Sequence, residues 1–467
     1  MLCRAFAFVG TAILLGCGSR EAVSQSSGNG QDSGVDAGSV ISDSDAGPGQ
    51  SGADGGTTAG GDGGSDAGTV AGGDAGFKPR DPTTAVAMPQ SVASSRICRV
   101  TVPRTASAWP GWSELAATAS DQFAAAVDTD GAIYLGEWNG GFEVRRETAS
   151  GWQSFPRLLV TSYFWAFTVA RGHPILARTF AGPVTSPDQY WPWDVEVQRL
   201  GDGGWERLGA AFEAIPHIDP IGAQTAGKPA LVADSLGRVL LMFDSEKGPS
   251  YGQAAYRWDG AWTAIGSPGI VNVSYGGYSS AIIPGAGDRA WMMSSWANRT
   301  NANLGCYDTG VHVASFDGTA WTGLGEMKRI RGLSEDTGCP LSDLSSASLA
   351  VGDDGNPLIA FDEDGHVYLD RWTGLAWALD SDWPGATGRY GSVTLSAVAN
   401  GGLWLTWVDL ERPDLKVVVQ RKQATAWETV DELRSASRGA VLCVDEAGNP
   451  VMTVTDAKGG HLLYRQP

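Results

Sequence analysis

Two short acidic stretches carry carboxylates at a spacing that a hard cation can use. Asp128-Thr129-Asp130-Gly131 is one, and residues 362–365 (Asp-Glu-Asp-Gly), with Asp370 nearby, are the other. Calcium is bound in proteins by carboxylate and carbonyl oxygens. Asp-Gly is also the commonest signal for a tight β-hairpin turn. We expect turns, with calcium binding as the alternative, and no other cofactor is indicated.

No group of residues marks a catalytic centre. Acidic residues fall on many expected loops, but none form a recognisable pair of the kind that a glycosidase needs. They include Asp219, Glu335, Asp336, Glu411 and Asp414. The five histidines have no metal-ligand spacing, and there is no His-Glu-x-x-His, Gly-x-Ser-x-Gly or phosphate loop. We therefore expect a non-catalytic binding module; the alternatives are an exported glycoside hydrolase or lyase and a scaffold subunit of an envelope complex.

Aromatic residues gather on segments that we expect to be long loops. The ligand-binding candidates are Tyr190, Trp191, Trp193, Tyr251, Tyr278, Trp296, Tyr307 and Tyr390. Exposed Tyr and Trp combine an apolar face with a polar tip, which suits sugars and protein partners. Packing of the loops themselves is the alternative role. The expected partner is a glycan or an envelope or extracellular protein.

The charge balance excludes two classes of partner. The chain of 467 residues has 33 Lys and Arg against 52 Asp and Glu, a net charge of −19. Nucleic acid and anionic membrane surfaces are bound through Lys and Arg patches. The densest basic run, residues 328–331, is short. We expect no nucleic acid partner, and membrane contact only through a lipid anchor.

The first seventeen residues have the pattern of a bacterial export signal. Arg4 supplies a positive start, and residues 5–15 form an apolar run too short to span a bilayer. Leu14-Leu15-Gly16-Cys17 resembles the lipobox of bacterial lipoproteins, which implies cleavage after residue 16 and lipidation of Cys17. With Gly18 in place of Asp, the resemblance implies the outer membrane of the cell envelope. An ordinary secretory signal with an incidental Cys is the alternative.

Residues 17–77 are expected to form a disordered tether. They are rich in Gly, Ser, Ala and Asp, with Asp-Ala-Gly occurring four times, and offer little apolar surface to bury. A flexible chain of this length has a mean extension of roughly 40 Å. Residues 78–97 are a lead-in segment, and residues 98–467 form the folded domain.

A unit containing a strand, a turn and a second strand opened by Trp recurs through the domain. Tyr256–Gly266 is its clearest copy. The landmark Trp residues are 152, 205, 262, 321, 377 and 427, at spacings of 50 to 59 residues. Such periods are typical of propeller blades. An earlier apolar hairpin in each unit brings the total to four strands, the content of one blade.

The ends of the domain indicate how the ring closes. Residues 432–467 contain three expected strands but not the fourth, which opens with Trp in the other units. Ala108–Leu115 is a strand of that fourth kind, without the other three strands before it. Joining the two leaves no exposed sheet edge. We therefore predict an all-β, seven-bladed β-propeller of four-stranded blades, with six or eight blades as alternatives. The predicted blades are 116–157, 158–209, 210–266, 267–325, 326–382, 383–431, and 432–467 with 98–115.

Four cysteines lie in the domain, an even number that indicates two disulfides in an exported protein. Cys306 and Cys339 fall on loops that leave the same face of a propeller, so we expect them to pair. Cys98 with Cys443 would then tie the N-terminal segment to the blade it completes. Free buried thiols are the alternative.

Residues 98–467 resemble kelch and galactose-oxidase-like propellers, and the Asp-box propellers of sialidase-type proteins. The Asp-box pattern is Ser-x-Asp-x-Gly-x-x-Trp at the turn between the third and fourth strands. Ser315, Asp317 and Trp321 match it, but Gly318 follows the Asp directly. The resemblance implies an architecture and a turn position. It does not carry over an activity, because propellers serve as enzymes, lectins and scaffolds.

Overall fold

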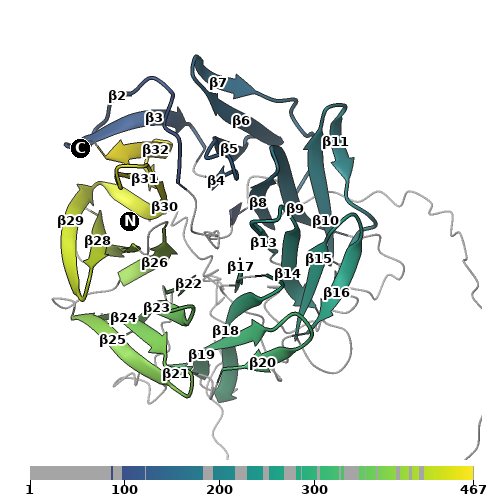
Figure 1. Ribbon diagram of the computed structural model, residues 1–467, viewed down its shortest axis with the longest axis vertical. Coiled ribbons are helices and arrows are strands. Elements are labelled where there is room, and N and C mark those ends of the chain that lie inside the picture. Colours follow the sequence, from purple (N-terminus) through teal and green to yellow (C-terminus); the bar gives the residue numbers. More distant parts are fainter. Residues whose placement is uncertain are drawn as a thin grey trace, which may run out of the picture. The chain divides into compact units, whose positions relative to one another are not determined.

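Every regular element in the described part of the chain is a β-strand (Figure 1). The structure is a computed structural model describing residues 86–87 and 97–465, without 121, 163, 182–192, 216–228, 246–251, 268–279, 286, 302–305, 325–327, 331–345, 353, 364–365, 385–389, 399–401 and 410–414. Within these ranges no helix is long and apolar enough to cross a membrane.

Six sheets follow one another along the chain, each with four antiparallel strands in sequence order. The first two consist of β4 (Phe123–Val127), β5 (Ile133–Trp138), β6 (Phe142–Thr148) and β7 (Gly151–Ser154), then β8 (Phe164–Ala170), β9 (His173–Ala181), β10 (Trp193–Gly201) and β11 (Gly204–Arg207). The third and fourth consist of β13 (Ala230–Ala233), β14 (Val239–Ser245), β15 (Gly252–Trp258) and β16 (Trp262–Gly266), then β17 (Ser280–Pro284), β18 (Ala290–Asn301), β19 (Cys306–Phe316) and β20 (Trp321–Gly323). The fifth and sixth consist of β22 (Ala347–Val351), β23 (Pro357–Glu363), β24 (His366–Trp372) and β25 (Trp377–Pro384), then β26 (Tyr390–Ala397), β27 (Leu403–Asp409), β28 (Lys416–Gln423) and β29 (Ala426–Arg434).

The seventh sheet joins the two ends of the domain. It contains β30 (Ala436–Val444), β31 (Pro450–Asp456), β32 (Gly459–Arg465) and, as fourth strand, β3 (Trp112–Thr118). In the antiparallel register Trp112 lies opposite Arg465, and Thr118 opposite Gly460. In Figure 1 the blue β3 lies beside the yellow β32. Short strands extend some sheets: β1 (Val86–Ala87), β2 (Thr105–Ala106), β12 (Phe212–Ile215) and β21 (Lys328–Ile330).

The first strand of each sheet contacts the first strand of the next, in the order β4, β8, β13, β17, β22, β26, β30 and back to β4. This arrangement closes a ring of seven blades (Figure 1). Apolar clusters fill the spaces between neighbouring sheets, as where Trp109 and Trp112 pack with Val417 and Val441 between the sixth and seventh blades. The predicted propeller, its blade number and its split blade are confirmed.

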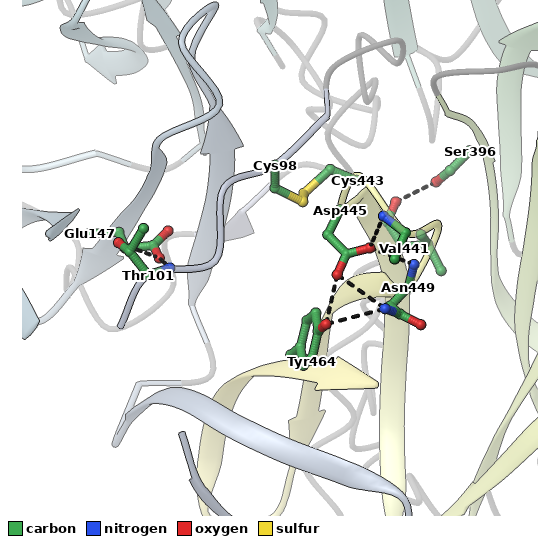
Figure 2. Close-up of a disulfide and its surroundings, with 10 residues drawn as sticks. Cys98, Thr101, Glu147, Ser396, Val441, Cys443, Asp445, Asn449 and Tyr464 are labelled. Carbon is green, nitrogen blue, oxygen red and sulfur yellow. Dashed lines mark hydrogen bonds between the residues drawn. A yellow bond between two sulfur atoms is a disulfide. The ribbon is translucent and has the colours of Figure 1, made fainter. Parts of the chain in front are cut away.

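The segment before β3 is fastened to both sides of the seam between the seventh and first blades (Figure 2). Cys98 forms a disulfide with Cys443 of β30, which confirms the predicted pairing. The backbone N–H groups of Thr101 and Val102 donate to the Glu147 carboxylate of β6, at 3.0 Å for Val102. Glu147 is only 5% exposed, so these bonds replace the water that its charge would otherwise need. The predicted Cys306–Cys339 pair lies outside the residues whose side chains are described.

The landmark Trp residues link each blade to the one before it. Their indole N–H groups donate to a backbone carbonyl in the preceding blade's fourth strand or within two residues of its end, most often three residues after that blade's own Trp. The bonds are Trp152 to Leu115 (2.8 Å), Trp205 to Pro156 (2.9 Å), Trp262 to Leu208, Trp321 to Ile265 (2.7 Å) and Trp377 to Leu324 (3.0 Å). The repeated Trp is therefore a structural residue that joins blades.

The junction between the fifth and sixth blades departs from this pattern. The buried Nε1 of Trp427 has no hydrogen-bond acceptor in the described structure. Asp380, three residues after Trp377, directs its carboxylate to Lys422 at 2.7 Å and to Arg371 at 3.3 Å. Burial alone would raise the pKa of Asp380, but the Lys422 ammonium and the other donors outweigh it and lower that pKa. An ion pair therefore links these two blades.

Replacement of either disulfide cysteine by Ser should destabilise the domain. The bond closes a loop spanning 345 residues, and loss of a native disulfide commonly costs about 2–5 kcal/mol. We expect Cys98→Ser, Cys443→Ser and the double variant to lower the thermal unfolding midpoint by the same amount, because all three remove one bond. Losses that add up in the double variant would contradict the pairing.

The indole hydrogen bond can be measured by comparing two Trp-to-Phe variants. Trp321→Phe loses the bond to the Ile265 carbonyl, whereas Trp427→Phe loses a donor that has no acceptor. Both changes keep an aromatic ring between blades. We expect Trp321→Phe to cost about 1 kcal/mol more in unfolding free energy, the usual net value of such a bond. Equal losses in urea denaturation would show that packing, and not the N–H, joins the blades.

Candidate functional site

The antiparallel order of each blade gives the ring two distinct faces. Turns between first and second strands, and between third and fourth strands, emerge on one face, which we call the turn face. Connections between second and third strands, and between successive blades, emerge on the other, the loop face. This division follows from strand direction alone, because each strand reverses the one before it.

The turn face is tied together by hydrogen bonds between neighbouring blades. Backbone carbonyls in the turns between first and second strands accept hydrogen bonds from residues that precede their blade. Gly131 accepts from the Arg99 N–H (2.9 Å), and Gly172 from the Tyr134 hydroxyl (3.2 Å). Leu236 accepts from the Arg171 side chain (3.0 Å), and Gly287 from the Arg238 side chain (2.7 Å). Burial raises the pKa of Tyr134 to about 12, so this phenol remains a hydrogen-bond donor. These turns serve the scaffold.

The acidic stretch at 128–131 is one of these turns. Asp128 accepts a hydrogen bond from the Thr129 N–H at 2.8 Å, and Asp130 accepts one from the Ala132 N–H at 2.9 Å. Asp130 also contacts Arg146 at 3.2 Å. Among the described residues, no three His, Cys, Asp or Glu side chains are grouped closely enough to hold a metal ion. In the second acidic stretch, Asp362 accepts from the Ser346 N–H at 2.8 Å, and residues 364–365 lie outside the described structure.

Half of the predicted aromatic candidates lie outside the described part of the chain, and the side chains of the other half are not described. Tyr190, Trp191, Tyr251 and Tyr278 fall in undescribed segments. Trp193, Trp296, Tyr307 and Tyr390 are described by their backbone alone, on β10, β18, β19 and β26. The acidic candidates Asp219, Glu335, Asp336, Glu411 and Asp414 also lie outside it.

Residues 294–310, expected to be a loop, mostly continue the hairpin of the fourth blade. The ladder between β18 and β19 runs from the pair Ala290–Phe316 to the pair Asn301–Cys306. The sequence there is polar and lacks the alternation of apolar and polar residues that marks a half-buried strand. Pairing satisfies the backbone N–H and C=O groups without needing a core.

A cleft opens on the loop face where the seventh blade meets the first. It has a volume of about 560 Å³, within the range of roughly 300–1,000 Å³ that is typical of small-molecule sites. Its walls are the end of β3, the connection that follows β3, the end of β5 with its turn, and the middle of β6. The lining residues are Ala117, Thr118, Ala119, Ser120, Gln122, Glu137, Trp138, Asn139, Gly140 and Arg145.

Hydrogen bonds across the seam hold the cleft in shape. The Thr118 hydroxyl of the seventh blade donates to the Glu137 carboxylate of the first. The Ser120 hydroxyl donates to the Trp138 carbonyl at 2.8 Å, which fastens the connecting segment to β5. Gly460 of β32 leaves space for the Phe123 ring of β4, since a Cβ added at Gly460 would lie 2.1 Å from that ring. The cleft is therefore built from both blades.

The cleft presents both hydrogen-bond donors and acceptors. Arg145 lies 3.5 Å from Glu137, with the two side chains 22% and 13% exposed, and its Nη2 also donates to the Ala117 carbonyl at 3.4 Å. Asn139 is exposed at the rim and can both donate and accept. Such a set suits an uncharged, hydroxyl-rich ligand.

None of these lining residues is among the site candidates that the sequence predicts. The turn between the second and third strands of the first blade, Asn139-Gly140-Gly141, is short and contains no Tyr or Trp. A usable signal exists in Glu137, a carboxylate one residue before the end of an otherwise apolar strand. Its partner Thr118 is nineteen residues earlier and in another blade, so spacing alone does not connect them.

The remaining titratable groups serve packing. The described histidines lie on four different blades: His173 contacts the Leu200 carbonyl (3.0 Å), His366 stacks on Tyr368, and His461 lies 2.8 Å from Glu114. Burial lowers the pKa of His312. Glu196, fully buried in the second blade, is paired with Arg178 at 2.5 Å and Arg207 at 2.7 Å. These groups do not converge on a common site.

Comparison with known proteins gives a likeness of fold and no family. No family model and no curated protein matches the chain. Among solved structures, it is similar to a fucose-specific lectin from Aleuria aurantia (13% identity, TM-score 0.39, covering 68% of this chain and 96% of the lectin). It is also similar to a Dyadobacter fermentans protein of unknown function (11%, 0.37, 77% and 100%) and a Trypanosoma rangeli sialidase (9%, 0.34, 68% and 55%).

These likenesses are too distant to assign a ligand or an activity. A propeller architecture by itself is compatible with binding and with catalysis. Function must be argued from the site. The class established here is a seven-bladed β-propeller with a polar cleft at the seam where its ring is closed.

The turn that resembles an Asp-box gives a titration that can be checked. Hydrogen bonds from the Ala320 N–H and from the Thr319 hydroxyl and N–H lower the pKa of Asp317 to about 2. The turn is therefore stabilised above the ordinary Asp pKa of about 3.9, and this contribution is lost as the pH falls through the lower value. NMR titration should find a midpoint near 2, raised in Thr319→Val. A wild-type midpoint near 4 would contradict the assignment.

Proposed function

We propose that this protein is a non-catalytic, glycan-binding module that meets its ligand on the loop face, with the seam cleft as the described part of the site. The main support for glycan binding is the lining of the cleft, where carboxylate, guanidinium, amide and hydroxyl groups converge on one space of about 560 Å³. Sugars present many hydroxyls that both donate and accept, and such a lining matches that chemistry.

The rigidity of the cleft supports binding with little loss of entropy. Its walls are strand ends fixed by the Thr118–Glu137 and Ser120–Trp138 bonds, so the polar groups are already positioned before a ligand arrives. The predicted aromatic candidates would extend the same face.

The lining favours binding over glycoside hydrolysis. A hydrolase needs two carboxyl groups across the bond that is cleaved. Glu137 is the one carboxylate among the ten lining residues, and it is engaged by Thr118 and Arg145. The cleft therefore has an acceptor for a sugar hydroxyl and lacks an acid–base pair.

The proposal places the module at the bacterial cell surface. The lipobox-like Leu14-Leu15-Gly16-Cys17, followed by a tether rich in Gly, Ser, Ala and Asp, supports attachment to the outer membrane through a lipid on Cys17. Metabolic labelling with a fatty-acid analogue tests this part separately. Label in the wild type and none in Cys17→Ser is the expected result.

A glycan array of the full mature chain, followed by mass spectrometry of the arrayed glycans, tests the function. Binding with intact glycans is expected. Cleaved glycans would replace the proposal with an exported carbohydrate-active enzyme. No binding at all would favour a protein partner or a scaffold role in an envelope complex.

Two neighbouring arginines provide a matched test of the cleft. Arg145 lines it, whereas Arg146, next on the same strand, contacts Asp130 on the turn face. Arg145→Ala should weaken binding of an array hit by at least about tenfold, the usual effect of losing a charged hydrogen bond. Arg146→Ala removes the same charge and should leave affinity unchanged in calorimetry. Equal effects of the two variants would show that the cleft is not the site.

A further inference from the structure

The charged side chains at the seam cleft are paired with one another. In the lining, Glu137 of β5 lies 3.5 Å from Arg145 of β6. Beside the rim, Arg157 lies 3.2 Å from Glu143, and its Nη2 is 3.3 Å from the position of a Cβ added at Gly140. Among these described residues, a ligand with a negative charge therefore meets two arginines that already have carboxylate partners.

The register of the β5–β6 hairpin explains this pairing. Glu137 lies directly opposite Glu143 in the antiparallel ladder, so both side chains are on the same face of the first blade. Arg145 follows Glu143 by two residues and shares that face. Like charges in opposed positions are unfavourable, and here each carboxylate has its own arginine. Arg145 is thus held as the counter-charge of Glu137.

Glu137 keeps acceptor sites that a ligand can use. The Thr118 hydroxyl donates to its Oε2, and Arg145 lies nearest its Oε1. An ionised carboxylate has about four lone-pair sites and no donor. It can therefore accept a charge-assisted hydrogen bond from a sugar hydroxyl, whereas it repels a second carboxylate. Because Glu137 is only 13% exposed, solvent screens its charge incompletely.

We propose that Glu137 is a specificity-determining residue that restricts the cleft to neutral glycans and rejects glycans with a carboxylate at the bound position. This role rests on the proposed glycan-binding function of the cleft and adds the class of sugar. Neutral sugars satisfy Glu137 through their hydroxyls, whereas uronic and sialic acids place a second anion beside it. The selectivity arises from an unfavourable contact with the wrong ligand.

Replacement of Glu137 by Gln should remove this selectivity. Gln has nearly the same size and keeps an oxygen that can accept from the Thr118 hydroxyl. Arg145 then lacks its carboxylate partner and can pair with the carboxylate of an acidic sugar. Glu206→Gln is the matched control, because it removes the same charge from an Arg–Glu pair outside the cleft, where the Arg199 Nε lies 2.9 Å from Glu206.

Calorimetry on the full mature chain tests the role with two probes that differ in charge. One is a neutral hexose oligosaccharide that binds on the array, and the other is the same oligosaccharide oxidised at C6 to the uronic acid. We expect the wild type to bind the neutral probe at least about tenfold more tightly. This ratio should fall at least about tenfold in Glu137→Gln and change less than about twofold in Glu206→Gln.

The outcomes separate the role of Glu137 from the proposed function. Array hits that are all acidic, or a ratio that is the same in Glu137→Gln and the wild type, would overturn the role of Glu137 and leave glycan binding in place. Absence of any array hit would overturn both. The double variant Glu137→Gln with Arg145→Gln should lose the gained affinity for the acidic probe. A gain that persists would show that Arg145 is not the group released.

The salt dependence of binding to the wild-type chain needs no substitution. Because salt screens repulsion between charges, binding of the acidic probe should strengthen as salt rises from about 0.02 M to about 0.5 M. Binding of the neutral probe should stay constant over the same range. An acidic probe that binds more weakly at high salt would show attraction by a cation and would contradict rejection by Glu137.

Discussion

Closure of the ring by β3 is the constraint on which the remaining structure depends. Without it, β32 would present an unpaired edge and the Trp152 indole would lose its acceptor, the Leu115 carbonyl. The strand comes from the opposite end of the domain, so its association carries a large loop-closure entropy. The Cys98–Cys443 bond and the contacts of Glu147 oppose that cost on the two sides of the same seam.

The seam that needs the most reinforcement also carries the cleft. Thr118 ends β3 and reaches across to Glu137, so the wall that closes the fold is also a wall of the site. At four other junctions a Trp indole joins one blade to the next through a single backbone carbonyl, a link that repeats because each blade repeats. At the seam the chain is discontinuous, and side chains from distant parts of the sequence are brought together.

Repetition explains what the sequence could predict. Trp spacing, turn residues and the missing strand at each end define seven blades, and they place Cys98 beside Cys443 because both belong to the shared blade. The cleft has no such signal, since Glu137 and Arg145 are ordinary polar residues until β3 is placed beside them. Residues 294–310, predicted to be a loop, are the outer part of the β18–β19 hairpin, and their polar sequence lacks the alternation of a half-buried strand. Val86–Ala87 is too short to show a period.

The position of a binding site on this propeller follows from where hydrogen-bonding groups are already used. On the turn face, the carbonyls of neighbouring turns accept from the blade before them, and Asp445 is occupied by Tyr464 and Asn449 (Figure 2). Around the axis, inner strand edges pair with the chain's own N-terminal segment at Val86 and Ile97. On the loop face, the cleft keeps the exposed Asn139 amide and part of Arg145 open to solvent. A ligand can use polar groups that the fold positions but does not fully engage in its own hydrogen bonds. Within the described structure, such groups converge at the seam.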